Sequence, residues 1–187
     1  MDYFINHIQS IYRLSEDAQG ALKTHLKKKS LTKGDFILKE GSICHHLYFL
    51  EKGCVRGFYN LDGKEVTHWF GFENDFVTSF YSFITNKPSV ENLQVLEDTV
   101  LWYISNQELL KLYDLYPEIE RLGRIANEKY YIRLEERYVN FQFKTAAERY
   151  QLLIENAPHI LQRVSLGHIA SYLGISQETL SRIRSKH

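Results

Sequence analysis

The sequence contains little cysteine and no long hydrophobic run. Only Cys44 and Cys54 occur among the 187 residues, which is too few for a framework of disulfide bonds. No apolar run approaches the roughly 18 residues that a membrane helix requires. The N-terminus, which begins Met1-Asp2-Tyr3-Phe4, lacks the basic, apolar and small-residue order of a signal peptide. We therefore expect a cytoplasmic protein with reduced cysteines and no membrane contact.

The sequence also has no net charge, since 23 Lys and Arg balance 23 Asp and Glu. The balance is uneven along the chain. Residues 141–187 hold six basic and three acidic residues, and residues 1–140 hold the remaining 17 basic and 20 acidic residues. Such asymmetry hints that one end meets a polyanion, although a mildly basic segment is more often a solvated surface. Because 44% of the residues are hydrophobic and 14% are aromatic, the chain is able to bury a sizeable core.

Periodicity and turn signals divide the chain into a helical, a β and a second helical region. Apolar residues recur at helical spacing in residues 1–29, and Ser15 is a plausible helix start. From Leu31 onward, short β-branched and aromatic runs alternate with glycine turns, which predicts a small barrel or sandwich. The Asp62-Gly63 pair is the strongest hairpin signal. The expected strands are Phe36–Leu38, Leu47–Leu50, Val55–Tyr59, Val66–Phe70, Leu93–Leu96 and Thr99–Ser105, with a short helix or loop at Phe80–Ile84.

Three helices are expected after Ser105, over residues 107–116, 117 to about 138, and 144–156. Pro117 suits the first turn of the second helix, which would be about 30 Å long. Apolar residues seven apart suggest that this helix forms a dimer, and periodicity alone leaves packing against its own domain equally open. The candidate dimer residues are Leu122, Ile125, Ile132 and Val139.

The segment from Val164 onward carries the most specific pattern. Ser165 is placed to cap a helix through Tyr172, Gly174 suits a helix end with positive φ, and Ser176 is placed to cap a second helix from Gln177. Two short helices joined by a tight glycine turn form a helix-turn-helix. The apolar residues that would form its core are Ile169, Ala170, Leu173, Ile175, Leu180 and Ile183. The alternative interpretation is an ordinary helical hairpin in a bundle.

The outer face of the second helix favours DNA binding. Arg pairs with guanine, Gln with adenine and Glu with cytosine in the major groove, and hydroxyl groups at helix N-termini donate to phosphates. The candidate DNA-binding residues are Ser165, Ser176, Gln177, Glu178, Thr179, Ser181, Arg182 and Lys186.

The whole chain resembles the Crp–Fnr superfamily of bacterial transcription regulators. The N-terminal resemblance rests on Lys33-Gly34-Asp35-Phe36-Ile37, Glu40-Gly41, Leu47-Tyr48-Phe49-Leu50, Gly53, Val55-Arg56 and Gly63-Lys64-Glu65. The C-terminal resemblance rests on Ile169-Ala170, Leu173-Gly174-Ile175-Ser176 and Glu178-Thr179-Leu180-Ser181-Arg182.

The resemblance implies an α+β fold with an N-terminal antiparallel β-roll, jelly-roll-like and flanked by helices. It places a cyclic-nucleotide-binding-like sensor domain at 1–116, a long dimerisation helix at 117–140 and a helix-turn-helix domain at 141–187. The implied partners are double-stranded operator DNA, a second copy of the chain and RNA polymerase. By motif match, the base-reading positions fall on Gln177, Glu178 and Arg182.

Two departures from the family pattern are visible. The family's cyclic-nucleotide pocket requires an arginine for the buried phosphate, and residues 57–120 contain none. Ser79 stands where the ribose-binding Glu would be, and Ser89-Val90 stand where the Arg and its small neighbour would be. We therefore expect cyclic AMP and cyclic GMP to bind weakly or not at all. The sequence also ends at His187, directly after the recognition helix, so we expect no β-hairpin wing.

The degenerate pocket leaves the effector unidentified. Aromatic residues around it are either core or the lining of an apolar pocket. The residues assigned to this pocket are Phe70, Ser79, Phe80, Ser89 and Val90.

Other functions have weaker signals. Two cysteines cannot hold an iron–sulfur cluster. Cys44, His45 and His46 are adjacent, so a strand would point them to opposite faces rather than to one metal ion. His68 as a haem ligand and a cupin-like metal enzyme both lack the required ligand spacing. We expect no cofactor, no metal and no catalytic site; a small-ligand sensor without DNA binding is the next alternative.

Overall fold

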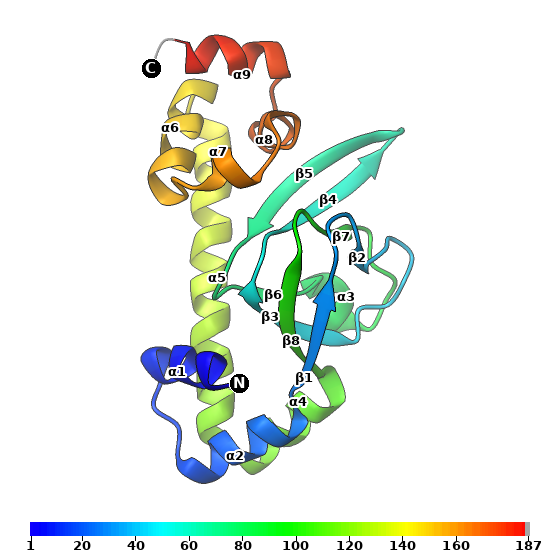
Figure 1. Cartoon of the computed structure of the whole chain (residues 1–187), viewed down its shortest axis with the longest axis vertical. Coiled ribbons are helices and arrows are strands. Elements are labelled where there is room, and N and C mark those ends of the chain that lie inside the picture. Colours follow the sequence, from blue (N-terminus) through cyan, green and yellow to red (C-terminus); the bar gives the residue numbers. More distant parts are fainter. Residues whose placement is uncertain (186–187) are drawn as a thin grey trace.

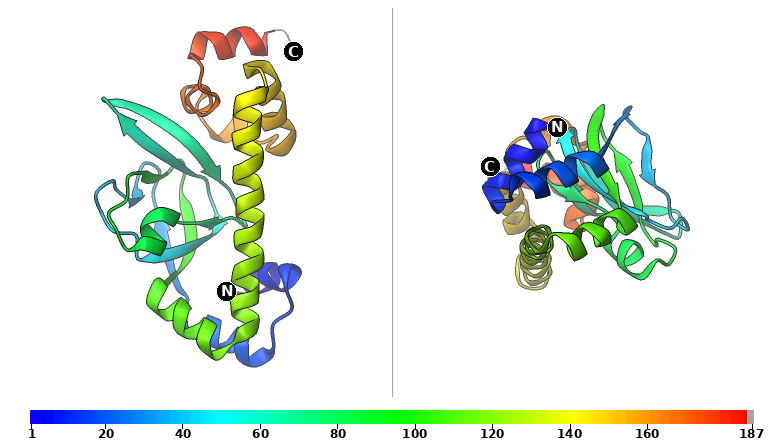
Figure 2. Two further views of the ribbon diagram at one scale, coloured as in Figure 1. Left: turned by 180° about the vertical axis from the view of Figure 1, so that it is seen from behind. Right: turned by 90° about the horizontal axis from the view of Figure 1, so that it is seen from below.

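Helix α5 (Pro117–Phe143) forms a spine along which the rest of the chain is arranged (Figure 1). In this computed structural model, residues 1–185 are described. Helices near the start of α5 are α1 (Asp2–Ile11), α2 (Glu16–His25) and α4 (Asn106–Leu115). Helices at its far end are α6 (Ala146–Asn156), α7 (Ile160–Arg163), α8 (Leu166–Leu173) and α9 (Gln177–Arg184). The β-structure lies beside the middle of the spine, as the view from behind also shows (Figure 2).

The β-structure is a roll of two four-stranded antiparallel sheets, as predicted. One sheet has the strand order β1-β8-β3-β6 and the other the order β2-β7-β4-β5. The strands are β1 (Lys27–Leu31), β2 (Phe36–Leu38), β3 (His46–Lys52), β4 (Val55–Leu61), β5 (Lys64–Gly71), β6 (Phe76–Val77), β7 (Asn92–Val95) and β8 (Thr99–Ser105). Helix α3 (Phe80–Thr85) fills the segment for which the sequence left a helix or a loop open.

Local signals placed several elements correctly. Ser15 accepts a hydrogen bond from the Ala18 N–H and so caps α2. Asp62 and Gly63 have φ angles of 52° and 80° and turn β4 into β5, because a two-residue hairpin of this kind requires positive φ at both positions. Pro117 begins α5, where its missing N–H costs no helical hydrogen bond.

One prediction of secondary structure was wrong, two short elements were not predicted, and one helix is longer than expected. Lys27–Lys29 were expected to be helical, but the chain is already extended at Leu26, and Lys27 pairs with Tyr103 in the β1–β8 ladder. Strand β6 and helix α7 were not predicted, because two and four residues are too short to show periodicity. Helix α5 continues beyond the expected end near Tyr138 to Phe143.

Buried apolar residues form three clusters. One lies under α1, α2, α4 and the start of α5, and includes Phe49 and Trp102. A second fills the inside of the β-roll around Leu50 and Leu93. The third is the core of the C-terminal helices, and it includes Cys54 of the roll. The C-terminal helices therefore share a core with the β-roll.

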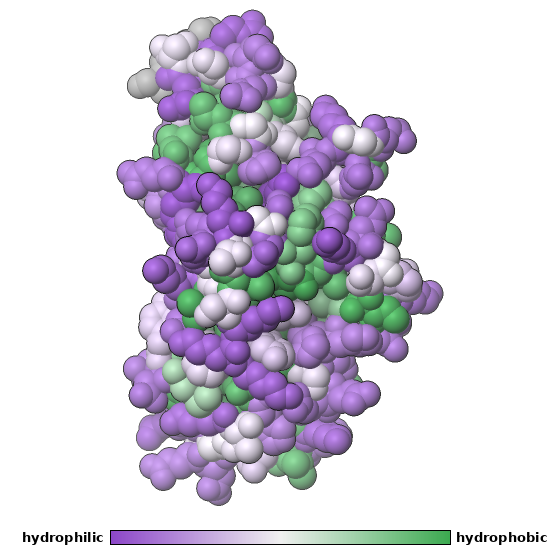
Figure 3. Space-filling view, turned by 45° about the vertical axis from the view of Figure 1, so that its right-hand side comes forward, coloured by the Kyte–Doolittle hydropathy of each residue, from purple (hydrophilic) through white to green (hydrophobic). Residues whose placement is uncertain are grey.

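Apolar side chains also reach the surface in patches, with hydrophilic side chains between them. The end of the molecule that carries α9, at the top of the view, is mainly hydrophilic (Figure 3). Among the described residues, no helix combines the length and the apolar character that spanning a membrane would require.

Candidate nucleic-acid interface and effector pocket

Helices α8 and α9 form the predicted helix-turn-helix. The Ser165 side chain accepts a hydrogen bond from the His168 N–H at 3.3 Å and so caps α8. Gly174 has a φ of 68°, and its N–H donates to the Ser171 carbonyl at 3.1 Å. The Ser176 hydroxyl then accepts from the Thr179 N–H at 3.2 Å and caps α9. Each cap forms where the sequence predicted it, because capping depends only on residues within one helical turn.

The core of this unit is the one that the sequence predicted. Its fully buried members are Ile169, Ala170, Leu173 and Leu180, and Ile175 and Ile183 pack partly buried against them. Tyr150 of α6 and Ile160 of α7 complete the cluster. The two helices are therefore held at a fixed angle by apolar burial.

The outer face of α9 is polar and exposed at the end of the molecule farthest from α1 and α2 (Figure 1). Its exposed side chains are Gln177, Glu178, Ser181, Arg182 and Arg184. Arg182 donates a hydrogen bond to the Thr179 hydroxyl at 3.2 Å, which holds its guanidinium against the preceding turn of α9. Ser165 and Ser176 are exposed at the helix N-termini. Lys186, which was also assigned to this interface, lies outside the described residues.

The helix-turn-helix is docked onto the β4–β5 hairpin, a contact that the sequence did not reveal. The Thr67 N–H donates to the Ser171 hydroxyl at 2.9 Å, and that hydroxyl donates to the Glu65 carbonyl at 3.0 Å. Arg56, only 3% exposed, contacts His168 Nδ1 at 2.9 Å and Glu65 Oε2 at 2.6 Å. Burial, and then the neighbouring Arg56 charge, lower the pKa of His168, so its neutral ring accepts a hydrogen bond from Arg56 at pH 7.

Arg163 of α7 forms a second link between the C-terminal helices and the β-roll. It donates to both Glu73 oxygens at 2.7 and 2.8 Å and also to Glu97. Burial alone would raise the pKa of the Glu73 carboxyl, but the hydrogen bonds that it accepts from Arg163 and from the Gly53 N–H lower that pKa to about 2. The Glu73 and Glu97 bonds raise the pKa of Arg163. The Glu73 carboxylate therefore remains ionised at neutral pH and keeps its bonds to Arg163.

Two residues of the predicted effector pocket, Ser79 and Ser89, bond to each other. The Ser79 and Ser89 hydroxyls are 3.0 Å apart, and both residues are buried. Ser89 also donates to the Glu91 carbonyl at 2.8 Å. Two hydroxyls that satisfy each other leave neither a cation nor free donors for a phosphate.

The Glu91 side chain, two residues beyond Ser89, bonds to two residues of β5. The buried Glu91 carboxylate accepts from His68 Nε2 at 2.6 Å and from Trp69 Nε1 at 3.1 Å. The Trp69 indole lies directly over Gly57, where a Cβ atom would come within 2.2 Å of Nε1. Only glycine at position 57 allows this ring to pack there.

The other residues assigned to the pocket lie elsewhere. Phe70 packs in the C-terminal cluster, with its ring centroid 5.3 Å from that of Tyr172. Phe80 stacks on Tyr130 of α5 at 4.2 Å, and Val90 is 56% exposed. The structure therefore brings Ser79 and Ser89 together, places Phe70 and Phe80 on the wall of a neighbouring cavity, and leaves Val90 at the surface.

The four candidate dimer residues do not share one environment. Leu122 is buried in the first cluster, so it contacts its own domain, whereas Ile125 is half-buried. Ile132 and Val139 are exposed. Further exposed apolar residues of α5 are Tyr130, Tyr131, Leu134, Tyr138, Phe141 and Phe143.

The residues weighed as metal ligands point to different partners. Cys44 lies 3.3 Å from the Thr78 hydroxyl, and the His46 ring packs against Tyr103. His68 is bonded to Glu91. Within residues 1–185, no group of three or more His, Cys, Asp or Glu side chains is arranged to hold a metal ion.

The chain is a β-roll joined by a long helix to a helix-turn-helix, and it shares this fold with solved structures of Crp/Fnr-family regulators. Residues 28–116 match the family model for the cyclic nucleotide-binding domain. No curated protein sequence matches the chain significantly.

Three solved structures show the likeness in detail. FixK2 from Bradyrhizobium japonicum superimposes with a TM-score of 0.72 at 23% identity, covering 86% of this chain and 83% of that one. The c-di-GMP responsive global regulator CLP from Xanthomonas campestris has a TM-score of 0.70 at 19% identity, covering 92% and 91%. A transcriptional regulator of the Crp/Fnr family from Eubacterium rectale has a TM-score of 0.70 at 17% identity, covering 91% and 82%.

These likenesses confirm the fold that the sequence resemblance implied.

Proposed function

We propose that this chain is a sequence-specific DNA-binding transcription regulator of the Crp–Fnr type. The observation that carries the proposal is the α8–Gly174–α9 unit, whose second helix exposes Gln177, Glu178 and Arg182 at the outer end of the molecule. These side chains have the donors and acceptors that read base edges in the major groove. The hydroxyls at Ser165 and Ser176 stand at helix N-termini, where they would donate to phosphates.

The DNA-binding step is tested by selecting duplexes from a random pool and measuring affinity by fluorescence anisotropy. Specific binding should weaken steeply with salt, because phosphate contacts release counterions. Arg182→Ala should weaken specific binding about 5- to 150-fold, since one good base contact contributes about 1–3 kcal/mol. Arg124→Ala, on an exposed part of α5, is the matched control. Binding without sequence preference, or equal loss in both variants, would contradict the proposal.

We also propose that the active form is a homodimer joined through α5. The support is the exposed apolar surface of that helix, in which Tyr131 is 64%, Ile132 54% and Tyr138 62% exposed. Large apolar side chains exposed along one helix usually mark an interface. Ile132→Glu should shift the protein from dimer to monomer in light scattering. Leu115→Glu, at an exposed leucine of α4, should leave the dimer intact.

Finally, we propose that cyclic AMP and cyclic GMP are not effectors. The support is the lack of arginine in residues 57–120 together with the Ser79–Ser89 contact, because a buried phosphate requires a cation and free hydrogen-bond donors. Calorimetric titration of the purified protein should show no heat of binding at micromolar concentrations. Micromolar binding of either nucleotide would refute this part of the proposal.

A further inference from the structure

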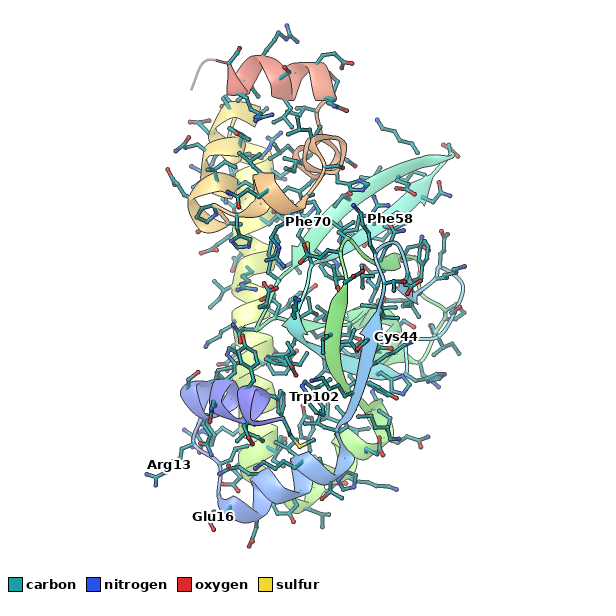
Figure 4. All side chains as sticks on the ribbon, in the orientation of Figure 1. Arg13, Glu16, Cys44, Phe58, Phe70 and Trp102 are labelled. Atoms are coloured by element: carbon teal, nitrogen blue, oxygen red, sulfur yellow. The ribbon has the colours of Figure 1, made fainter. Side chains whose placement is uncertain are left out.

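A cavity of about 470 Å³ lies where the β-roll, α5 and the C-terminal helices meet. Its walls include Trp69 and Phe70 of β5, Phe80 of α3, Tyr130 and Arg137 of α5, and Tyr172 of α8. Figure 4 labels Phe70 at this junction. The volume is in the range of sites that bind small molecules. Neither Ser79 nor Ser89 lines this cavity, so it is distinct from the effector pocket that the family resemblance places at those two residues.

Arg137 is the unusual residue of this cavity. It is half-buried, yet among the described residues it forms no ion pair and donates no hydrogen bond. Its guanidinium forms a cation–π contact with the Tyr172 ring, whose centroid lies 4.8 Å from the guanidinium carbon. By contrast, Arg56 and Arg163, which link the β-roll to the C-terminal helices, are each paired with carboxylates.

The surroundings of Arg137 do not compensate its charge. Burial lowers the pKa of Arg137, and the neighbouring side chains of Tyr172, Tyr59 and Tyr130 offset this effect only in part. A single aromatic ring replaces only part of the hydration that a guanidinium loses on burial. The site is therefore a desolvated cation that lacks an anion.

Two acidic side chains also line the cavity. Asp75 is paired with Arg133 at 2.8 Å, and Glu136 is exposed at the rim. Arg149, the third arginine of the lining, donates to the carbonyls of Lys144 and Leu173, and its Nε is buried without a partner. One available guanidinium beside two carboxylates suits a ligand with a single negative charge.

We propose that this cavity binds a small aromatic carboxylate. The carboxylate would accept two parallel hydrogen bonds from the planar Arg137 guanidinium. The ring of the ligand would lie among Phe70, Trp69 and Tyr172, since aromatic side chains favour flat partners. A doubly charged phosphate fits less well, because Asp75 and Glu136 would repel its second charge.

Such a ligand would connect the sensor to the DNA-binding unit. The cavity takes walls from the β-roll, from α5 and from α8, so an occupant would stabilise the docked position of the helix-turn-helix. This regulatory consequence rests on the proposed function, whereas ligand binding itself does not. Binding is therefore measured without DNA, so that failure of the site and failure of the proposed function are distinguishable.

The test is calorimetric titration of the full chain with benzoate, phenylacetate and 2-naphthoate, and with the matching uncharged amides. At least one acid should bind saturably and its amide at least tenfold more weakly. Arg137→Gln should weaken acid binding at least tenfold, Arg137→Lys less, and Arg124→Gln not at all. Melting curves show whether each variant is folded.

Tryptophan fluorescence provides an independent measurement. Trp69 lines the cavity and Trp102 lies in another cluster, so a Trp102→Phe variant reports on Trp69 alone. Benzoate or phenylacetate should change its emission with the same dissociation constant that calorimetry gives. The proposal is overturned if no acid binds saturably, if the amides bind equally well, if a folded Arg137→Gln protein binds unchanged, or if cyclic AMP binds through Arg137 in preference to the acids.

Discussion

Arg163 should be the main electrostatic link between the DNA-binding helices and the β-roll, and Arg163→Gln tests this. The substitution leaves Glu73 and Glu97 without their shared cation, whereas the wild-type guanidinium donates to both. The side chains of Arg163, Glu73 and Glu97 are 20% to 33% exposed, so these ion pairs are intermediate between a surface ion pair and a buried one. Surface pairs contribute about 0–1 kcal/mol and breaking a buried pair costs about 3–5 kcal/mol. We therefore expect a loss of about 2–3 kcal/mol.

The loss is measurable in two ways. For a chain of this length, about 2–3 kcal/mol corresponds to a decrease in Tm of about 4–12 °C. Hydrogen exchange should also accelerate in α8, because α8 is bonded to β5 and depends on the docked arrangement. A double-mutant cycle with Glu97→Gln should give a coupling energy of about 1 kcal/mol or more.

Arg124→Gln is the matched control, because Arg124 pairs with Glu128 on an exposed face of α5. Such a pair contributes about 0.3–0.5 kcal/mol. If Arg163→Gln destabilises the protein by no more than this control, or if exchange in α8 is unchanged, then the C-terminal helices are held by apolar burial alone and the reasoning is refuted.

Three further predictions concern backbone and pH. Gly174→Ala should destabilise the protein by about 1–2 kcal/mol in denaturant unfolding, because Gly174 has a positive φ, and a Cβ would also come within 3.2 Å of Phe141; an unchanged midpoint would contradict this. Gly57→Ala should expel the Trp69 indole and change the near-ultraviolet circular dichroism, since the Cβ would overlap that ring; identical spectra would show that Trp69 packs elsewhere. Because folding lowers the pKa of Glu73 from 4.5 to about 2, its contribution is complete above pH 4.5 and is lost as the pH falls toward 2. We expect about 1–2 kcal/mol of acid-sensitive stability after solvent screening, and Glu73→Gln should remove that part of the pH dependence.

The sequence by itself determined the features that depend on neighbours within one or two turns. Ser165 and Ser176 cap their helices, Gly174 ends α8, and Asp62-Gly63 forms the hairpin, each as predicted. Hydrogen bonds and φ angles within a few residues decide a cap or a turn, so a short stretch of sequence is enough to predict it. The order of these signals predicted a small barrel or sandwich and a helix-turn-helix, and the family resemblance implied that the β-structure is a β-roll.

Only the tertiary structure decided how these parts meet. Thr67 and Ser171 are 104 residues apart, and Arg163 and Glu73 are 90 apart, yet each pair is bonded. The absence of arginine from residues 57–120 predicted the loss of the phosphate clamp, but not that Ser79 and Ser89 would bond each other, or that Arg137 would face a cavity unpaired. Contacts between distant segments leave no periodic pattern in a single sequence, because they depend on where the packed core places each segment.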